Sequence, residues 1–283
     1  MKNKTISRLL IITLIIFANF SNSTAQKRTN SSLDSAYTVS PVSPDTLEAF
    51  KYSVLDLRAI SSGFSDGAKV YISPFHWAGN DWLKVLALGG TALAIHQLDI
   101  PLNDLVSHNN TPFIKGFSKT FEPFGNLFYI LPAIGSTYIY AHLSGKNDDL
   151  SGFAITAGKA VIIANTLATL SKVLTHRHRP NDDTPTKINQ WDGPRLDLKD
   201  VSFFSSHAVT AFSLASVIAS TYADHKWVPP VAYTMASLVG LSRITGNDHW
   251  ATDVFVGAVL GYGIGKLVYK LNRSKKIKLV ITL

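Results

Sequence analysis

The chain has 283 residues, which is enough for one large or two small domains with a sizeable core. Hydrophobic residues make up 46% of it and charged residues only 16%, below the usual roughly one quarter, so long buried or lipid-facing segments are expected. The absence of cysteine excludes disulfides, thiolate metal sites and a lipid-modified N-terminal cysteine. The formal net charge of +8 favours an anionic lipid or an anionic small molecule as ligand. Nucleic acid is not expected as a partner, because no basic run outside the C-terminal tail would form a binding face.

The N-terminus has the pattern of a secretory signal. Three basic residues precede an apolar run, Leu9–Phe20, and the small residues Ser23–Ala25 follow it. We therefore predict a signal peptide over residues 1–25, cleaved before Gln26, and export from the cytoplasm. The alternative is that this segment stays attached as a membrane anchor.

A linker and a helix are expected next. Residues 26–44 are rich in Ser, Thr, Asn and Pro with few apolar residues, which is typical of a flexible linker. Residues 45–71 predict an amphipathic helix lying on the rest of the protein or on a membrane surface. Its apolar residues stand at helical spacing, at Phe50, Val54, Leu57 and Ile60. We assign residues 45–272 to one helical domain with its core at 153–271, and residues 273–283 to a basic tail.

Six apolar segments follow, separated by turns rich in Gly, Asn, Asp and Pro. No alternating pattern of any length precedes the closing sequence IKLVITL. The expected fold class is therefore all-α, a bundle of about six long helices with any active site at one end. The segments are Trp82–Ile95, Leu127–Leu143, Phe153–Leu174, Ala208–Ala223, Trp227–Leu241 and Val254–Leu271.

Length and composition disagree on whether these segments cross a membrane. Several are only about 14 to 17 residues long, short of the roughly 20 that a span needs, and Lys84 and Lys159 interrupt two of them. Against this, Gly and Ala are frequent inside the later segments, as in close-packed membrane bundles, and aromatic residues lie near segment ends, where a bilayer interface would fall. We favour a membrane-embedded bundle over a soluble periplasmic one.

The basic tail predicts the orientation. Its Lys and Arg residues place it in the cytoplasm by the positive-inside rule, so the start of the last segment, near Asp253, faces outside. A cleaved signal then requires an odd number of spans, and omitting the weakest candidate, Trp82–Ile95, leaves five. If the signal remains as an anchor, the number is six.

The residues best suited to chemistry lie in Ser242–Asp253, SRITGNDHWATD. His249 and Asp253 are four residues apart, so on the first turn of a helix the carboxylate could orient the imidazole. Arg243 precedes them across a turn containing Gly246 and could return to the same place with a forked positive charge that suits phosphate. A surface pair or a helix cap would give the same pattern, so this motif alone does not establish a site.

A second basic motif, Lys172–Pro180 (KVLTHRHRP), ends the third segment. Lys172 and Arg179 are seven residues apart, nearly two helical turns, so both cations can face the same way. The alternative is a basic helix end that complements the helix dipole. The residues expected to add local positive potential are His176, Arg177 and His178.

The third motif, Phe204–His207 (FSSH), opens the next segment. Ser205 is placed as an N-cap, and the free backbone N–H groups at a helix start form an anion site to which His207 adds a donor. Each of the three motifs lies where one segment ends or the next begins. Because successive helices of an up-and-down bundle alternate in direction, all three motifs fall at the same end.

Together these motifs resemble a known signature. K-x6-RP at Lys172–Pro180, SSH at Ser205–His207 and SR-x5-H-x3-D at Ser242–Asp253 are similar to the three-part signature of the phosphatidic acid phosphatase type 2 and vanadium haloperoxidase superfamily. The second part departs from the usual PSGH, with Phe204 in place of Pro and Ser206 in place of Gly. Ser206 keeps the backbone N–H but adds a side chain near the phosphate, which concerns substrate fit more than mechanism.

The resemblance implies a metal-independent phosphohydrolase without a cofactor. In such an enzyme His249 would attack phosphorus and form a phosphohistidine, Asp253 would fix its tautomer, and His207 would protonate the leaving oxygen and then activate water. The groups that would bind the phosphoryl oxygens are Lys172, Arg179, Arg243, the Ser205 hydroxyl and the Ser206 N–H.

Three other functions fit the sequence less well. A zinc site at His207, His249 and Asp253 is disfavoured because no HExxH is present and the nearby Arg and Lys residues would repel a cation. Vanadate-dependent haloperoxidase activity is disfavoured by the short chain, and a binding protein with a degenerate site by the completeness of the signature.

The substrate class follows from location. In or near a membrane the expected partner is a phosphorylated lipid, whereas a soluble periplasmic protein would be a non-specific acid phosphatase acting on small phosphomonoesters. The stretch 181–202, between the first two motifs of the signature, is expected to form a polar flap beside the pocket.

Overall fold

The computed structural model describes residues 57–144, 148–181 and 190–282. Within these ranges the chain forms helices and irregular segments, with no strand apart from two isolated β-bridges, Arg177–Trp191 and His178–Val201. The all-α prediction is confirmed for this part of the chain. The predicted signal peptide, the linker and the first part of the amphipathic helix lie outside the described residues.

The helices alternate with short turns along the described chain. The α-helices are α3 (Leu57–Ile72), α4 (Gly79–His96), α5 (Asp99–His108), α6 (Pro112–Phe121), α7 (Leu127–Ser144), α8 (Asp148–Thr175), α9 (Ser206–Thr221), α10 (Val228–Thr245) and α11 (Ala251–Thr282). Two short 3-10 helices are η2 (Ser73–His76) and η3 (Glu122–Phe124).

Each of the six predicted apolar segments forms a helix, namely α4 and α7 to α11. The predicted end of the last one was wrong, because α11 continues to Thr282 and includes residues assigned to the basic tail. Lys and Arg are good helix formers, so the helix outlasts its apolar part. The sequence analysis missed α5 and α6, which have 10 residues each and contain no long apolar run.

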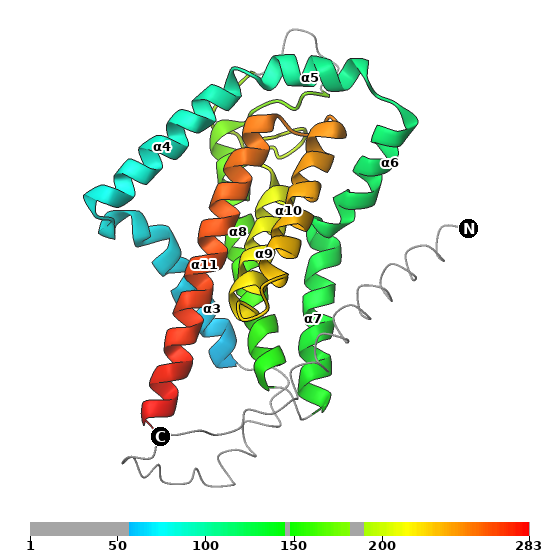
Figure 1. Ribbon diagram of the computed structural model, residues 1–283. Helices are drawn as coiled ribbons and strands as arrows, with labels where there is room; N and C mark the ends of the chain where they lie inside the picture. Colours follow the sequence, from blue (N-terminus) through cyan, green and yellow to red (C-terminus); the bar gives the residue numbers. More distant parts are fainter. Residues whose placement is uncertain (1–56, 145–147, 182–189, 283) are drawn as a thin grey trace.

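The long helices α8 to α11 form the centre of the bundle, and α9 packs against the other three. Outside them, α7 packs along α8, and α3 contacts α8 and α11. In Figure 1, α5 crosses above one end of the bundle and α4 slopes away from it. The helix ends beneath α5 are the last turns of α8 and α10 and the first turns of α9 and α11. The predicted convergence of the three motifs at one end is therefore found.

Glycines allow α9 and α11 to approach closely. Gly257, Gly261 and Gly265 recur every fourth residue of α11 on the side that faces α9. A Cβ atom at Gly261 would lie 2.6 Å from the backbone oxygen of Val209, and one at Gly265 would lie 2.5 Å from that of Ser213. Such close backbone contact through small residues is typical of helix pairs in membranes. It brings the first turns of α9 and α11, which carry site residues, next to each other.

Small residues fill the interior of the bundle, and large apolar residues lie on its outside. α4 is apolar along much of its length yet has no buried residue. The face of α8 turned inward consists largely of alanines that are at most 1% exposed, at Ala154, Ala157, Ala160, Ala164 and Ala168. By contrast, exposed large side chains on α7 and α8 include Phe128, Tyr140, Leu143, Ile162, Leu170 and Leu174. This distribution suits a lipid surrounding better than water.

Two helices, α8 and α11, are long and apolar enough to cross a membrane, over Asp149–Thr175 and Ala251–Arg273. The pair α4 and α5 meets the same test together but is bent by 45° at the break between them. By length and composition the described residues thus hold two or up to three candidate spans, fewer than the five expected after the N-terminal signal. The difference arises because α9 has only 16 residues, and the 18 residues of α7 and of α10 include Pro, Ser, Thr and Tyr.

Lys159, which interrupts an apolar segment of the sequence, is paired inside the bundle. Its Nζ donates hydrogen bonds to Ser62 Oγ at 2.7 Å and Asn272 Oδ1 at 2.9 Å, and it lies 3.4 Å from Asp66 Oδ2. The Asp66 side chain is fully buried. Because it is paired with Lys159, neither charge is left without compensation. This polar cluster attaches α3 to α8 and α11.

We predict that Gly261→Ala destabilises the bundle and that Gly263→Ala does not. In a helix without close neighbours either change would stabilise by roughly 0.5–1 kcal/mol. At Gly261, however, the new methyl group would meet the backbone of α9, whereas nothing lies within 4 Å of a Cβ at Gly263. Thermal unfolding in detergent should show a midpoint several degrees lower for Gly261→Ala only. Equal midpoints would contradict the close approach of α9 and α11.

Candidate active site

Lys172 and Arg179 reach the site from the C-terminal end of α8. Lys172 lies in the last turn of this helix, which ends at Thr175. His176 has a positive φ of 43° and turns the chain out of the helix. Arg179 therefore does not share a helical face with Lys172, as the spacing suggested. It lies in the following loop, where its Nη1 is 3.8 Å from Asp248 Oδ1.

Ser205 and Ser206 form the start of α9. Ser205 is the N-cap that the sequence predicts, because its Oγ accepts a hydrogen bond from the backbone N–H of Ala208 at 3.3 Å. Its own N–H donates to the backbone oxygen of Asp253 at 3.1 Å and joins the starts of α9 and α11. Ser206 Oγ accepts a hydrogen bond from Lys172 Nζ at 2.9 Å. The side chain that replaces the usual Gly thus holds the lysine of the first motif.

A tight turn after α10 returns the chain to Arg243. Asn247 has a positive φ of 60°, which Asn adopts more readily than most residues. The backbone N–H groups of Asp248 and His249 both donate to the Arg243 carbonyl oxygen, at 3.0 and 3.3 Å. The turn containing Gly246 therefore brings Arg243 and His249 together, as expected from the sequence.

His249 lies just before α11, not on its first turn as the sequence suggested, because the helix begins at Ala251. Asp253 is on the first turn, and its Oδ2 is 3.6 Å from His249 Nδ1. This distance allows attraction between charges but is longer than a hydrogen bond. The same Oδ2 accepts the backbone N–H of Trp250 at 3.0 Å and so closes the start of the helix.

Arg177 is fully buried between two carboxylates, so the interpretation that it adds positive potential to the site was wrong. Its Nη1 donates to Asp253 Oδ1 and its Nη2 to Asp99 Oδ2, each at 2.6 Å. The guanidinium carbon lies 4.8 and 5.2 Å from the ring centroids of Trp191 and Trp250. The charge of Arg177 is thus neutralised by carboxylates inside the protein, and its hydrogen bond orients Asp253.

Asp99, on the first turn of α5, completes this buried network. Its Oδ1 accepts the backbone N–H of Thr252 at 2.9 Å, and its Oδ2 accepts the Thr252 hydroxyl at 2.7 Å. His96 Nδ1 lies 3.0 Å from Asp99 Oδ2. Sequence reasoning missed Asp99, because it stands far from the three motifs and no local pattern marks it.

His207 contacts a second carboxylate that the sequence analysis did not single out. Its Nε2 lies 3.1 Å from Oε1 of Glu122 in η3. This hydrogen bond lowers the pKa of Glu122 to about 2, so the carboxylate stays charged. Burial lowers the pKa of His207, while its hydrogen bond to Glu122 acts in the opposite direction. Asn126 Nδ2 donates to the same Glu122 oxygen at 2.9 Å and fixes its position.

His249 is a neutral imidazole in this environment. Burial lowers its pKa well below the usual value, and the positive charges of Lys172, Arg179 and Arg243 lower it further. Those three cations are thus close enough to act on His249 electrostatically. A neutral, buried imidazole has a free electron pair at physiological pH and can act as a nucleophile.

Asp248 holds the two arginines of the site. Its Oδ2 accepts a hydrogen bond from Arg243 Nη2 at 2.6 Å, and its other oxygen lies near Arg179. Both arginines are therefore already oriented toward a carboxylate, and an anion that enters the site could take the place of that carboxylate. Asp248 directly precedes His249, so the turn after α10 carries both side chains.

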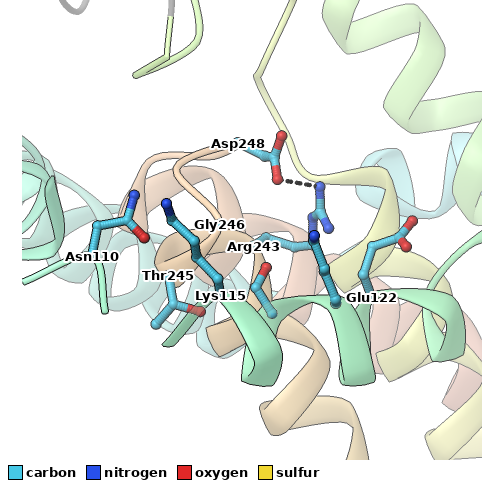
Figure 2. Close-up of a pocket in the computed structure, with 9 residues that line it drawn as sticks. Asn110, Lys115, Glu122, Arg243, Thr245, Gly246 and Asp248 are labelled. Atoms are coloured by element: carbon cyan, nitrogen blue, oxygen red, sulfur yellow. Dashed lines mark hydrogen bonds and ion pairs between the residues drawn. The ribbon is translucent and has the colours of Figure 1, made fainter. Parts of the chain in front are cut away.

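A cavity of about 360 Å³ opens beside Arg243. Figure 2 shows the Arg243–Asp248 pair near Glu122, with Lys115 and Asn110 toward the other side of the cavity. The lining residues are Asn110, Lys115, Ser118, Lys119, Glu122, Arg243, Thr245, Gly246 and Asp248.

The predicted flap is only partly described. Residues 182–189 of the stretch 181–202 lie outside the described ranges. Trp191 packs over Arg177 and lies 5.1 Å from Phe203 between ring centroids, so this part of the stretch covers the buried arginine. Ser202 Oγ donates to the backbone oxygens of Arg177 and His178, each at 3.1 Å.

The arrangement suits attack on a bound anion. It combines a neutral imidazole near a buried carboxylate, a second imidazole with its own carboxylate, and three cations around them. In the described ranges, no group of three or more His, Asp or Glu side chains could hold a metal ion.

Comparisons with known proteins agree with the motifs. Residues 153–277, which include all three motifs, match the PAP2 superfamily. Over 72 residues the chain is 42% identical to lipid A 1-phosphatase of Porphyromonas gingivalis, covering 25% of this chain and 16% of that protein. Over 122 residues it is 30% identical to decaprenylphosphoryl-5-phosphoribose phosphatase of Mycobacterium tuberculosis, covering 43% of this chain and 63% of that protein.

Both matches thus cover less than two thirds of the relative's length. Among solved structures, the transmembrane PAP2 type phosphatidylglycerolphosphate phosphatase from Bacillus subtilis matches with a TM-score of 0.48 and 21% identity. That match covers 70% of this chain and 94% of the other. The match to the PAP2 superfamily thus covers residues 153–277, the part of the chain that contains all three motifs.

Proposed function

We propose that the protein is a metal-independent phosphatase that hydrolyses a phosphate monoester or diphosphate of a lipid through a phosphohistidine intermediate. The observation that carries the proposal is the buried, neutral His249, which lies 3.6 Å from the Asp253 carboxylate. Lys172, Arg179 and Arg243 act on the same imidazole electrostatically. A nucleophile surrounded by cations requires an anionic electrophile, and a phosphoryl group is one.

In the proposed first step, His249 attacks phosphorus. Because Nδ1 faces Asp253, Nε2 is the nitrogen that attacks. The imidazole becomes positively charged when the N–P bond forms, and the negative charge of Asp253 stabilises it. Arg177 orients Asp253 by its 2.6 Å hydrogen bond. Asp253 and Arg177 would thus act together on one imidazole.

Cations and N–H groups would hold the phosphoryl oxygens. Arg179 and Arg243 would exchange their contacts with Asp248 for contacts with the substrate. Lys172, held by Ser206, and the N-cap Ser205 would complete the site at the start of α9. Losing one such donor typically costs about 3 kcal/mol of transition-state stabilisation.

His207 would transfer the protons. It protonates the leaving oxygen in the first step and takes a proton from water in the second, when the phosphohistidine is hydrolysed. Glu122, 3.1 Å away, holds its ring and favours its protonated form. The two histidines therefore have opposite tasks that match their surroundings: burial and three nearby cations keep His249 neutral, whereas His207 is paired with a carboxylate.

A lipid substrate agrees with the apolar exterior of the bundle and with the two candidate spans. The two named relatives are phosphatases of a lipid A phosphate and of a decaprenylphosphoryl compound. The basic tail lies at the opposite end of α11 from the site, so the positive-inside rule supports a site on the outer face. Export by the signal at residues 1–25 belongs to the same proposal.

The proposal is tested by phosphate release in detergent with EDTA from para-nitrophenyl phosphate and from a panel of lipid monophosphates and diphosphates. We expect release that survives EDTA, is faster on lipid substrates and is lost in His249→Ala. His108→Ala, an exposed histidine on α5, serves as the control and should retain activity. Release that EDTA abolishes, or that His249→Ala retains, would contradict the mechanism, and a preference for small esters would favour the soluble acid phosphatase reading.

The pH dependence tests the role of Glu122. The alkaline limb of kcat/KM reports the loss of the proton from His207 in the free enzyme. Glu122→Gln removes a negative charge that raises the pKa of His207, so this pKa falls and the limb moves to lower pH. Turnover at neutral pH should fall with it. Asp81→Asn, which removes an exposed carboxylate paired with Lys84 on α4, should leave the profile unchanged. A limb that stays in place or moves to higher pH in Glu122→Gln would rule out this role.

A further inference from the structure

None of the described residues that line the cavity beside Arg243 has an apolar side chain. The charged residues of its walls are Lys115, Lys119, Glu122, Arg243 and Asp248. The remaining lining residues are Asn110, Ser118, Thr245 and Gly246. A lipid chain would find no apolar side chain there. The space therefore suits a polar, hydrated part of a ligand.

Two lysines of this cavity have no charged partner among the described residues. Lys115 and Lys119 are exposed and one turn apart on α6, and neither forms a side-chain hydrogen bond or ion pair within the described part of the chain. The other charged groups of the cavity are paired: Glu122 with His207, and Asp248 with Arg243. Two uncompensated cations side by side favour an anion between them.

The position of α6 directs these lysines to the cavity. Ser118, between them in sequence, is buried and donates from Oγ to the backbone oxygen of Ser242 at 2.7 Å. Gly246 permits this close contact, because a Cβ there would lie 2.5 Å from Ser118 Oγ. The residues that line the cavity from this side recur at helical spacing, so one face of α6 and η3 forms the wall.

The same wall leads to the proposed leaving group. Glu122 lines the cavity and binds His207, which delivers the proton to the leaving oxygen. Arg243 lines the cavity and belongs to the phosphate site. A group attached to the leaving oxygen would thus extend from His207 along Glu122 toward Lys119 and Lys115.

We propose that this cavity binds a second phosphate group, carried on the leaving side of the substrate, and that Lys115 and Lys119 neutralise it. The inference rests on the proposed phosphatase function and narrows its substrate class to diphosphates and to lipids with a second phosphate near the scissile one. A phosphate carries up to two negative charges at neutral pH, which two lysines balance.

For a diphosphate the reaction balances as follows in atoms and electrons. His249 Nε2 forms a bond to the terminal phosphorus, and the bond from this phosphorus to the bridging oxygen breaks with its electron pair left on that oxygen. His207 gives its proton to the bridging oxygen, and the lipid monophosphate dissociates. Water then adds its oxygen to phosphorus, returns one proton to His207 and releases inorganic phosphate from His249.

The test compares two probes, methylenediphosphonate and inorganic phosphate, by calorimetry and as inhibitors of para-nitrophenyl phosphate hydrolysis. The full chain in detergent should bind the diphosphonate at least about tenfold more tightly than phosphate. In the double variant Lys115→Gln/Lys119→Gln this preference should fall about tenfold, with the affinity for phosphate unchanged. Lys69→Gln/Lys226→Gln removes the same charge from exposed positions outside the cavity and should keep the preference.

Equal losses for both probes, or an unchanged preference in the double variant, would overturn the proposal. A further measurement separates substrate from bilayer lipid, since exposed lysines can also bind anionic head groups. If the double variant bound phosphatidylglycerol vesicles more weakly with its probe preference intact, the lysines would serve the membrane and the proposal would fail.

Calorimetry keeps this inference distinct from the proposed function. A wild type that binds the probes with the expected preference but releases no phosphate would disprove turnover and still support the second subsite. A wild type that hydrolyses phosphate esters but binds both probes equally would disprove the subsite alone.

Discussion

The buried carboxylate of Asp253 is the group on which the arrangement of the site depends. It lies near His249, accepts the N–H of Trp250 and binds Arg177. An unpaired charge at this depth would be costly, so Asp253 requires Arg177. Arg177 in turn requires Asp99, because a buried guanidinium shared between two carboxylates satisfies more of its donors. The site is thus held by a chain of buried charges that ends on α5.

This dependence extends the site beyond the region that matches the family. Residues 153–277 supply both histidines and the three cations of the proposed phosphate site. The carboxylates that orient Arg177 and His207 come from α5 and η3, which precede that region. Lys115 and Lys119 of the proposed second subsite come from α6. In the proposed function, the preceding segment therefore supplies positioning and substrate selection, while the matched region supplies the chemistry.

The sequence predicted those parts of the fold and site that rest on local pattern. Long apolar segments gave the helices, and the N-cap Ser205 and the turn at Gly246 were recognisable from residue type. Asp99 and Glu122 could not be found in this way, because their partners are far away in the chain and neither stands in a motif. Arg177 was misassigned for the same reason: a basic residue between two histidines looks like a source of positive potential until Asp253 and Asp99 are seen on either side. Fewer of the described helices than expected have the length and hydropathy of a span, because small and hydroxyl residues that pack helices together also lower their hydropathy.

The central claim, that a buried charge network prepares His249 for attack on phosphorus, is tested most directly by rapid-quench measurement of the phosphoenzyme. With a 32P-labelled lipid phosphate, the wild type should form an acid-labile, alkali-stable phosphohistidine that maps to His249. Asp99→Asn removes one negative charge from the network, so Arg177 interacts more strongly with Asp253. Formation of the phosphohistidine should then slow about tenfold, which corresponds to a barrier higher by about 1.4 kcal/mol. Substrate affinity should not change. No acid-labile phosphoenzyme in the wild type, or an equal rate of formation in Asp99→Asn, would contradict the account.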